Sequence, residues 1–537
     1  MSAQNPSPPA TEGLRDPEHD PTASYALEPE YVASLTDRVL STTGRTAPVT
    51  SPLNGAPLAN IPQSSEDDVK EAFARARKAQ VAWARTSLEE RCATLLRLHD
   101  LVLERQDEII DLIIWESGKA RKHAFDEPLH VALTARYYAR TAHQHLDPQR
   151  KLGLVPGLTR VEVNQVPKGV VGIIAPWNYP FNLALIDGLP ALLAGNAVVT
   201  KPDAQTMLSA LLGAKLLDEA GFPKDLWQVV AGPGRELGGP IIERSDYVCF
   251  TGSTATGKII AQQCAERLIG CSLELGGKNP MLILRDADLE RAAEGAVRAT
   301  FSSAGQLCVS MERLFIADQI YDRFVERFVA RTKAMTLGAT LDWANDMGSL
   351  ISQDQLDTVL AHVEDAVAKG ARVLAGGRAR PDLGPYYFEP TILEGVNPDM
   401  SCFGSETFGP VISLYRFHDE ADAISRANAG DYGLNASIYT QDGARGRAIA
   451  SLVKCGTVNI NEAFGATFGS VDSPMGGMRQ SGMGRRQGSE GVHRYTESQS
   501  VATQRGMRLS PMFGVSDAAY AKLMTANLKL MKKLGRA

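Results

Sequence analysis

Short apolar strands alternate with segments of helical length through the middle of the chain, and this alternation limits the fold more than any other feature. The strands are expected at 170–176, 197–202, 227–232, 247–253 and 271–277. The helices between them are expected at 181–194, 205–220, 235–243 and 254–266. Strands that are apolar along their whole length are buried on both faces, and crossover helices make neighbouring strands parallel. The sequence therefore predicts an α/β fold with a doubly wound parallel sheet.

A second set of strands and helices follows, from NPMLILRDAD (279–288) to CGTVNINEA (455–463). A single hydrophobic core stops growing at about 250–300 residues, so a chain of 537 residues is expected to form more than one domain. Before the first strand, the pattern from Ser65 to about Ala142 is helical, and Ser65 is the expected cap of its first helix. We therefore predict two doubly wound parallel-sheet domains, the first of them preceded by helices.

Ligands of open parallel sheets bind at the carboxyl ends of the strands. That rule places these residues around one crevice: Pro176, Trp177, Asn178, Lys201, Gly232, Gly234, Gly252, Ser253, Glu274 and Leu275. At FTGSTATG (250–257) a strand ends and a helix begins, so Ser253 and Thr254 can present hydroxyl and N–H groups to a phosphate. Plain capping of the helix explains the same two residues equally well.

Composition and missing motifs exclude several kinds of site. The net charge of −6 argues against nucleic acid as a partner, because such sites need a basic footprint. Seven cysteines without a C-x-x-C spacing, together with the lack of H-E-x-x-H and G-x-S-x-G, argue against a disulfide framework, a metal site and a serine triad. No apolar run reaches the ~18 residues of a membrane helix. We expect a cytoplasmic protein without stable membrane insertion, whose residues 1–25 form a disordered tail.

Three residues remain as candidates for chemistry. Cys308 lies among small and polar residues in FSSAGQLCVSMERLF (301–315), whereas a structural cysteine usually lies in an apolar run. A thiolate presented on an exposed loop is an effective nucleophile toward a carbonyl carbon. Glu274 lies between two leucines at a strand end, where an apolar setting raises a carboxyl pKa toward that of a useful base. The side-chain amide of Asn178 could donate to an oxyanion.

Six motifs occur in a fixed order: PWNYPF (176–181), KPDAQT (201–206), FTGSTATGK (250–258), LELGGKNP (273–280), AGQLCVS (304–310) and ETFGPV (406–411). Together they resemble the aldehyde dehydrogenase superfamily, over about residues 45–505. Within it the chain looks most like the succinate-semialdehyde dehydrogenase group, with long N- and C-terminal extensions. The resemblance implies NAD(P)-dependent oxidation of a small-molecule aldehyde to a carboxylate.

The resemblance also implies a role for each matched position. Cys308 would form a thiohemiacetal with the aldehyde, and Asn178 with the Cys308 backbone N–H would hold the oxyanion. Once hydride transfer to the nicotinamide leaves a thioester, Glu274 would activate the water that hydrolyses it. Lys201 and Glu406 would hold the ribose next to the nicotinamide, with Phe408 against the ring. The remaining cofactor-binding positions would be Trp177, Asn178, Pro202, Asp203, Ala204, Gly234, Gly252, Ser253, Thr254 and Leu275.

Cofactor choice depends on a departure from the family pattern. In NAD-preferring members, the third residue after the KP lysine is a glutamate that holds the adenosine ribose hydroxyls, and here that residue is Ala204. Without a carboxylate at this position, a 2′-phosphate is not repelled. We therefore expect NADP, with NAD as the alternative because Asp203 lies next door.

Substrate choice depends on a second departure. Well-studied semialdehyde dehydrogenases clamp the substrate carboxylate with two arginines, and this chain has Ile186 and Ser302 at the matching places. Succinate semialdehyde, oxidised to succinate, is the substrate expected from the overall resemblance. A longer aliphatic or aromatic aldehyde is the alternative, because an apolar tunnel would be formed by Tyr179, Leu183, Ile186, Leu307 and Val309.

Domain boundaries follow from the resemblance and the strand pattern. The expected parts are a dinucleotide-binding domain (30–146 and 168–276), a catalytic domain (277–480), oligomerisation strands (147–167 and 488–507) and a C-terminal helical extension (508–537). TRVEVNQV (159–166) and YTESQSVATQ (495–504) alternate like exposed strands, which often pair with a partner subunit. A small β oligomerisation arm and a homodimer or homotetramer are therefore expected, and pairing within one molecule is the alternative.

Two other functions are alternatives to hydrolytic aldehyde oxidation: CoA-dependent acylation and non-catalytic binding. In a CoA-acylating member a thiol replaces water as the acceptor, and Glu274 argues against this because a base for water is of little use there. A non-catalytic binding protein on the same fold would require a lost nucleophile or base, and both Cys308 and Glu274 are present.

Overall fold

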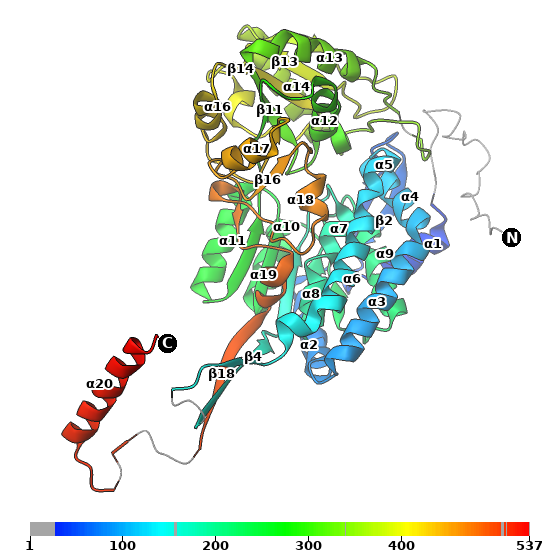
Figure 1. The fold of residues 1–537 in the computed structure, drawn as a ribbon. Helices are drawn as coiled ribbons and strands as arrows, with labels where there is room; N and C mark the ends of the chain where they lie inside the picture. Colours follow the sequence, from blue (N-terminus) through cyan, green and yellow to red (C-terminus); the bar gives the residue numbers. More distant parts are fainter. Residues whose placement is uncertain (1–26, 155–157, 339, 506–509, 512, 536–537) are drawn as a thin grey trace, which may run out of the picture. The chain divides into compact units, whose positions relative to one another are not determined.

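The computed structural model describes residues 27–535 except 155–157, 339, 506–509 and 512. Two compact units make up the chain (Figure 1). Among the described residues, the first unit runs to His145 and continues over Pro167–Tyr495, and the second unit contains Leu146–Val166 and the chain from Thr496 onward. The tail predicted at 1–25 lies outside the described residues.

A six-stranded sheet lies in the first unit. Its strands are β5 (Val170–Ile174), β6 (Ala197–Lys201), β7 (Trp227–Val229), β8 (Tyr247–Thr251), β9 (Gly270–Glu274) and β17 (Gly482–Met483). The strand order is β17-β9-β8-β5-β6-β7, in which β17 is antiparallel to β9 and the others are parallel. The predicted parallel sheet is confirmed. Its strand ends carry Lys201 and Glu274, the residues that the sequence places at one crevice.

Helices and a small hairpin accompany this sheet. They are α1 (Pro29–Thr36), β1 (Thr46–Thr50), β2 (Pro57–Pro62), α2 (Glu66–Trp83), α3 (Leu88–Glu104), α4 (Gln106–Ser117), α5 (Arg121–Ala124), α6 (Asp126–Leu146), α7 (Pro180–Leu185), α8 (Gly188–Leu193), α9 (Met207–Ala220), α10 (Gly234–Arg244) and α11 (Thr254–Glu266). Ser65 caps α2 as predicted: its hydroxyl accepts from the Asp68 N–H, and the Asp68 carboxylate accepts from the Ser65 N–H.

The single helix predicted at 181–194 is wrong, because α7 and α8 are separate helices broken at Ile186 and Asp187. Pro190 has no N–H to donate to the Ile186 carbonyl, so the helical ladder loses a hydrogen bond at this point. Gly188 follows the break and has a low helix propensity. The break leaves the Asp187 carboxylate free to bind side chains outside the helix.

A seven-stranded sheet forms the rest of the first unit (Figure 1). Its order is β12-β13-β14-β11-β10-β15-β16, parallel except for the β12–β13 pair. The strands are β10 (Asn279–Ile283), β11 (Met311–Ala317), β12 (Arg372–Ala375), β13 (Thr391–Glu394), β14 (Val411–Phe417), β15 (Asn435–Tyr439) and β16 (Thr457–Ile460). The helices are α12 (Leu289–Phe301), η1 (Ser302–Gly305), η2 (Asp318–Ile320), α13 (Tyr321–Lys333), α14 (Gln353–Ala368), α15 (Ser401–Gly404), α16 (Glu420–Ala427), α17 (Gly443–Ala450), α18 (Gly465–Gly469), η3 (Arg479–Ser481) and α19 (Gly488–His493). This is the second α/β set that the sequence predicts.

The second unit holds a three-stranded sheet of order β18-β4-β3, with β3 at Gln149–Lys151, β4 at Thr159–Pro167 and β18 at Thr496–Gln504. The two alternating segments are therefore strands, and they pair with each other within the chain. Residues 488–493 are not part of a strand as predicted. They form α19 of the first unit because Val492 and Tyr495 are fully buried there.

The C-terminal segment contains α20 (Asp517–Lys533), capped by Ser516, which confirms the predicted helix. None of its side chains is buried. Over the described residues, every helix is too short or too polar to span a membrane.

Candidate active site

The loop that carries Cys308 begins with three consecutive residues in the left-handed region. Ser303, Ala304 and Gly305 have φ angles of 50°, 54° and 71°. A Cβ on Gly305 would lie 2.1 Å from the Gly409 carbonyl oxygen, so only glycine fits at this position. Such backbone is strained and persists where the surrounding structure holds it. The turn directs the chain back from α12 and places Cys308 just before β11.

Neutral side-chain amides hold the backbone of this loop. The Asn178 Nδ2 donates to the Gln306 carbonyl at 3.0 Å. The Asn279 Nδ2 donates to the carbonyls of Cys308 and Ser310, both at 2.7 Å. Asn178 follows β5 of one sheet and Asn279 begins β10 of the other, so both sheets fix the position of Cys308.

The Cys308 thiol is free and only half-buried as a residue, whereas the sequence predicts a nucleophile on an exposed loop. Hydrogen bonds from the two buried amides tie the loop backbone to strands of both sheets. Burial, with the nearby Glu274 carboxylate as the second cause, raises the pKa of the thiol to about 12. Cys308 is therefore a thiol at neutral pH and must lose a proton when it reacts.

Glu274 ends β9 and is 5% exposed. Burial raises the pKa of its carboxyl group to about 7, against the opposing effect of the Arg486 guanidinium. Its Oε1 is buried and has no hydrogen-bond partner among the described residues. The apolar setting that the sequence indicates thus has the predicted effect, and Glu274 can exchange a proton near neutral pH.

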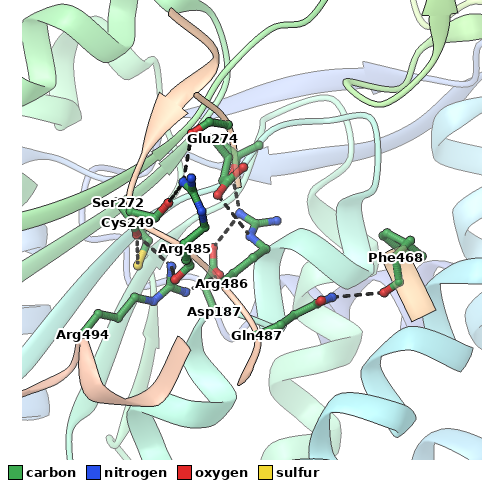
Figure 2. Close-up of polar contacts among 12 residues, drawn as sticks. Asp187, Cys249, Ser272, Glu274, Phe468, Arg485, Arg486, Gln487 and Arg494 are labelled. Atoms are coloured by element: carbon green, nitrogen blue, oxygen red, sulfur yellow. Dashed lines mark hydrogen bonds and ion pairs between the residues drawn. The ribbon is translucent and has the colours of Figure 1, made fainter. Parts of the chain in front are cut away.

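A buried cluster of charged side chains surrounds Glu274 (Figure 2). The Nη2 of Arg486 donates to Asp187 Oδ2 at 3.1 Å and to the Thr251 hydroxyl at 3.0 Å. The Nη2 of Arg494 donates to Asp187 Oδ1 at 2.6 Å. Sequence reasoning missed these residues. The signal was Asp187, a lone carboxylate in the apolar segment 181–194, because a buried charge requires a partner.

Most of the predicted cofactor-binding residues lie at or just after the ends of β5, β6, β7, β8 and β9, and Glu406 and Phe408 lie just before β14. Lys201 is buried, donates to the Pro202 carbonyl at 2.9 Å and forms no ion pair among the described residues. Burial lowers its pKa, with Asp203 opposing. A Cβ on Gly234 would lie 3.9 Å from Lys201 Cε, so Gly234 lies beside the Lys201 side chain.

Glu406 and Phe408 are the other two residues that the resemblance assigns to the nicotinamide end of the cofactor. The Gly277 N–H donates to Glu406 Oε1 at 2.8 Å, and burial raises the pKa of this carboxyl group to about 8. The rings of Phe408 and Trp177 meet edge to face with centroids 5.5 Å apart. An ammonium group, a carboxylate and an aromatic ring suit the hydroxyls, phosphates and base of a dinucleotide, so the residues fit the implied cofactor.

The adenosine end of the predicted site has no glutamate. The Asp203 carboxylate accepts from the Gln205 N–H at 3.0 Å, so it is bound to its own backbone in an Asx turn. Ser253 caps α11 by accepting from the Thr256 N–H at 3.3 Å, and Thr254 donates to the Gln480 carbonyl at 3.2 Å. Capping is therefore observed here, and a phosphate site at this helix stays a prediction.

Comparison with known proteins gives the family. The model of the aldehyde dehydrogenase family matches residues 39–501. The chain belongs to the aldehyde dehydrogenase family. A protein of Mycolicibacterium smegmatis, provisionally named an NADP(+) succinate-semialdehyde dehydrogenase, is 50% identical over 487 residues, which cover 91% of this chain and 94% of that protein. The Escherichia coli NADP(+) succinate-semialdehyde dehydrogenase is 35% identical and covers 84% of this chain and 93% of its own length.

Solved structures agree with this membership. An aldehyde dehydrogenase from Bacillus cereus, solved with NAD+, superimposes with a TM-score of 0.83 at 35% sequence identity. The superposition covers 89% of this chain and 99% of that one. The present aldehyde dehydrogenase therefore shares its two-sheet α/β fold with enzymes of the family, as the sequence predicts.

The predicted substrate residues of this aldehyde dehydrogenase are all buried: Tyr179, Leu183, Ile186, Ser302, Leu307 and Val309. The Tyr179 hydroxyl lies 3.2 Å from the Ser303 hydroxyl, which brings the PWN segment onto the cysteine loop. Ser302 donates to the Arg298 carbonyl at 2.7 Å. That these residues line an aldehyde tunnel stays a prediction.

A buried cation beside Tyr179 was also missed. The Lys119 ammonium lies 3.6 Å from the centroid of the Tyr179 ring and forms a buried ion pair with Glu127. Because Glu127 neutralises its charge, Lys119 is poorly suited to bind a second carboxylate. Lys119 follows Gly118, which ends α4 in the αL conformation, and this position gives no sequence signal for the contact between Lys119 and Tyr179.

Proposed function

We propose that this aldehyde dehydrogenase oxidises succinate semialdehyde to succinate with NADP, and that Cys308, Asn178 and Glu274 carry the reaction. The observation that supports these roles best is a cysteine loop whose backbone is held by neutral amides, with a buried carboxyl group of pKa about 7 near enough to affect the thiol. The names of relatives at 50% and 35% identity support the substrate and the cofactor.

The residues of the chain act in two stages. Cys308 Sγ loses its proton to solvent and forms a bond to the aldehyde carbon, and the Asn178 Nδ2 and the Cys308 N–H donate to the resulting oxyanion. NADP would supply the acceptor for the hydride of this carbon, and Lys201, Glu406 and Phe408 would hold it. Glu274 then takes a proton from water, whose oxygen attacks the thioester carbon. The C–S bond breaks, the product acid leaves and loses its proton to solvent, and the Cys308 thiolate takes the proton that Glu274 holds.

The choice of NADP is argued from the adenosine end of the site. Ala204 offers no carboxylate, and the Asp203 carboxylate is bound to the Gln205 N–H. One charge-assisted hydrogen bond contributes about 1.5–3 kcal/mol, so NAD lacks an anchor of that size while a 2′-phosphate meets no repulsion. Ala204→Glu is expected to move the ratio of kcat/KM for NADP over NAD toward NAD by roughly 10- to 150-fold.

Binding of the substrate carboxylate requires a cation, since Ile186 and Ser302 carry no charge. We assign this role to Arg298, which lies one helical turn before Ser302. Its guanidinium is half-exposed, 3.4 Å from Glu462 Oε1 and 5.5 Å from the ring of Phe464. An exposed pair of this kind is worth little, so a substrate carboxylate can compete for Arg298.

The test is a panel of aldehydes assayed with NADP and with NAD. Succinate semialdehyde and butanal have the same chain length and differ in the carboxylate. Arg298→Met is expected to raise KM for succinate semialdehyde at least tenfold, about 1.4 kcal/mol, and to leave KM for butanal unchanged. Equal kcat/KM for the two aldehydes in the wild type would contradict the proposed substrate.

A second candidate substrate is a longer aliphatic or aromatic aldehyde. It is favoured by the burial of Leu183, Ile186, Leu307 and Val309, all apolar and all predicted to lie along the tunnel. Rising kcat/KM from butanal to octanal or benzaldehyde would support it. Product formed without added CoA would exclude the CoA-acylating alternative, and a burst of reduced cofactor would exclude a non-catalytic binding protein.

A homodimer or homotetramer is proposed from the sheet of the second unit. β18 lies at one end of the order β18-β4-β3, and most of its residues are exposed. An exposed edge strand of this length is a template for pairing with another chain. A mass of 57.9 kDa by light scattering at micromolar concentration would contradict this. The division into a dinucleotide-binding and a catalytic domain at about residue 277, and the cytoplasmic location, stay predictions.

A further inference from the structure

Arg486 lies on the segment that joins β17 to α19, and its side chain is 8% exposed. β17 is antiparallel to β9 at Glu274, so this segment returns along the strand that carries the carboxylate. The Arg486 guanidinium lies between Asp187 and Glu274 (Figure 2). Its Nη2 is engaged by Asp187 and Thr251, which directs its Nε toward Glu274.

Two unpartnered atoms face each other here. The Nε of Arg486 and the Oε1 of Glu274 are both buried and have no hydrogen-bond partner among the described residues. They lie 4.0 Å apart, too far for a direct hydrogen bond and close enough for a small side-chain rotation to form one. Buried donors and acceptors are nearly always paired in folded proteins, so this donor and this acceptor are available to each other.

The charges of the cluster favour the ionised form of Glu274. Arg486 and Arg494 are positive, and Asp187 is negative and binds both. Arg485, the other cation near Glu274, donates to the carbonyls of Gly477 and Gly484, and the Cys308 thiol is neutral. Three guanidinium groups and one aspartate leave an excess of positive charge around Glu274, and an ionised Glu274 offsets part of it.

We propose that Arg486 is a positioning residue for Glu274: its Nε–H holds the ionised carboxylate ready to take a proton from the hydrolytic water, and thereby sets the pH above which the thioester is hydrolysed. This inference rests on the proposed role of Glu274 as the base. Asp187 has the opposite effect on the same group, because it repels the Glu274 carboxylate and holds part of the Arg486 charge.

The experiment follows thioester hydrolysis, measured as the steady state after a burst of reduced cofactor, across pH 5.5–9.5. The acid limb is the pH range in which this rate falls as Glu274 becomes protonated. An opposite charge within 4–6 Å lowers a carboxyl pKa by about 1–3 units, so Arg486→Met is expected to move the acid limb to higher pH by about one unit or more. Arg486→Lys should recover much of that shift. Asp187→Asn should move the limb downward, and the burst amplitude should stay near one per active site in each variant.

Arg91→Met is the matched control. The Arg91 guanidinium also has a buried, unpartnered Nε, and it donates to the Leu193 carbonyl away from Glu274. Its loss is expected to leave the acid limb unmoved. A generic loss of stability cannot shift the limb in opposite directions in Arg486→Met and Asp187→Asn, so these two variants separate positioning from a structural role. If Arg486→Met fails to fold, Arg486→Lys and Asp187→Asn still test the direction.

A second comparison separates this inference from the proposed function. In a Glu274→Gln background, Arg486→Met should have no further effect on hydrolysis. An acid limb that does not move in Arg486→Met, or an equal loss of rate with and without Glu274, overturns the positioning role. Hydrolysis at the wild-type rate in Glu274→Gln alone would instead overturn the role of Glu274.

Discussion

Neutral amides hold the backbone around Cys308, whereas charged side chains surround Glu274. Asn178 and Asn279 donate to carbonyls of the cysteine loop at 2.7–3.0 Å. Glu274 faces Arg486, which Asp187 binds in turn. The two regions meet closely enough that the Glu274 charge contributes to the high pKa of Cys308.

The difference matches the two chemical tasks proposed for the site. An oxyanion that appears and disappears is stabilised by fixed dipoles, which act without changing their own protonation. A base must instead carry and release a proton near neutral pH, and only nearby charges can counter the large effect of burial on its pKa. The same site therefore combines a region of dipoles with a region of opposed charges.

The largest effect is expected for Cys308→Ser, which removes the nucleophile from the neutral region. Turnover should fall below about a hundredth of the wild type, because a covalent nucleophile contributes several kcal/mol of transition-state stabilisation. Cofactor binding, measured by fluorescence titration, should be largely unchanged. A variant that kept more activity than this would mean that another group attacks the aldehyde.

Glu274→Gln tests the charged region by removing its titratable member. Thioester hydrolysis should slow by about 10²- to 10⁴-fold, the range of general base catalysis, while hydride transfer stays fast. Stopped-flow mixing should show one equivalent of reduced cofactor followed by a slow steady state. If both burst and turnover are lost, Glu274 acts before hydride transfer, for example on the Cys308 thiol.

Asn178→Ala removes one dipole from the neutral region. Loss of an oxyanion donor costs about 10²- to 10³-fold in kcat. Here the burst itself should slow, which is the reverse of the pattern expected for Glu274→Gln. A slow steady state with a normal burst would show that the amide serves hydrolysis instead.

The smallest effect is the pH dependence of the wild type. Glu274 acts as a base only when ionised, and burial raises its pKa to about 7. The hydrolysis rate should therefore fall about tenfold for each pH unit below 7 and level off above it. A rate that stays level down to pH 5 would mean that the carboxyl group keeps its usual pKa, and that Arg486 outweighs burial.

Local sequence predicted much of the first sheet and singled out Cys308 and Glu274 as candidates, whose roles stay predictions. The apolar strands at 170–176 and 247–253 are β5 and β8, because fully apolar segments of this length have no exposed face to present. The raised pKa of Glu274 could also be expected from its neighbours in the sequence. Leucines on both sides of Glu274 indicate a buried strand end, and burial raises the pKa of a carboxyl group. The break at Ile186 and Asp187 was missed although Gly188 and Pro190 are visible in the sequence.

Long-range contacts were beyond such reasoning. Asp187 and Arg486 are 299 residues apart, and the sequence around either residue does not indicate that the other is its partner. Thr496 and Gln165, hydrogen-bonded across β18 and β4, are 331 residues apart. The alternation of apolar and polar residues in each segment indicated an exposed strand that needs a partner. It did not identify the partner strand.

By itself, the sequence determined the alternation of strands and helices, the position of Cys308 in a polar loop and the apolar surroundings of Glu274, because these depend on residues that are close in the chain. Tertiary structure alone decided how far Cys308 is buried, which guanidinium faces Glu274 and where Asp187 finds its partners. The physical reason is that pKa values and loop positions depend on charges and dipoles within a few ångströms. Folding of the two sheets brings those groups together from distant parts of the chain.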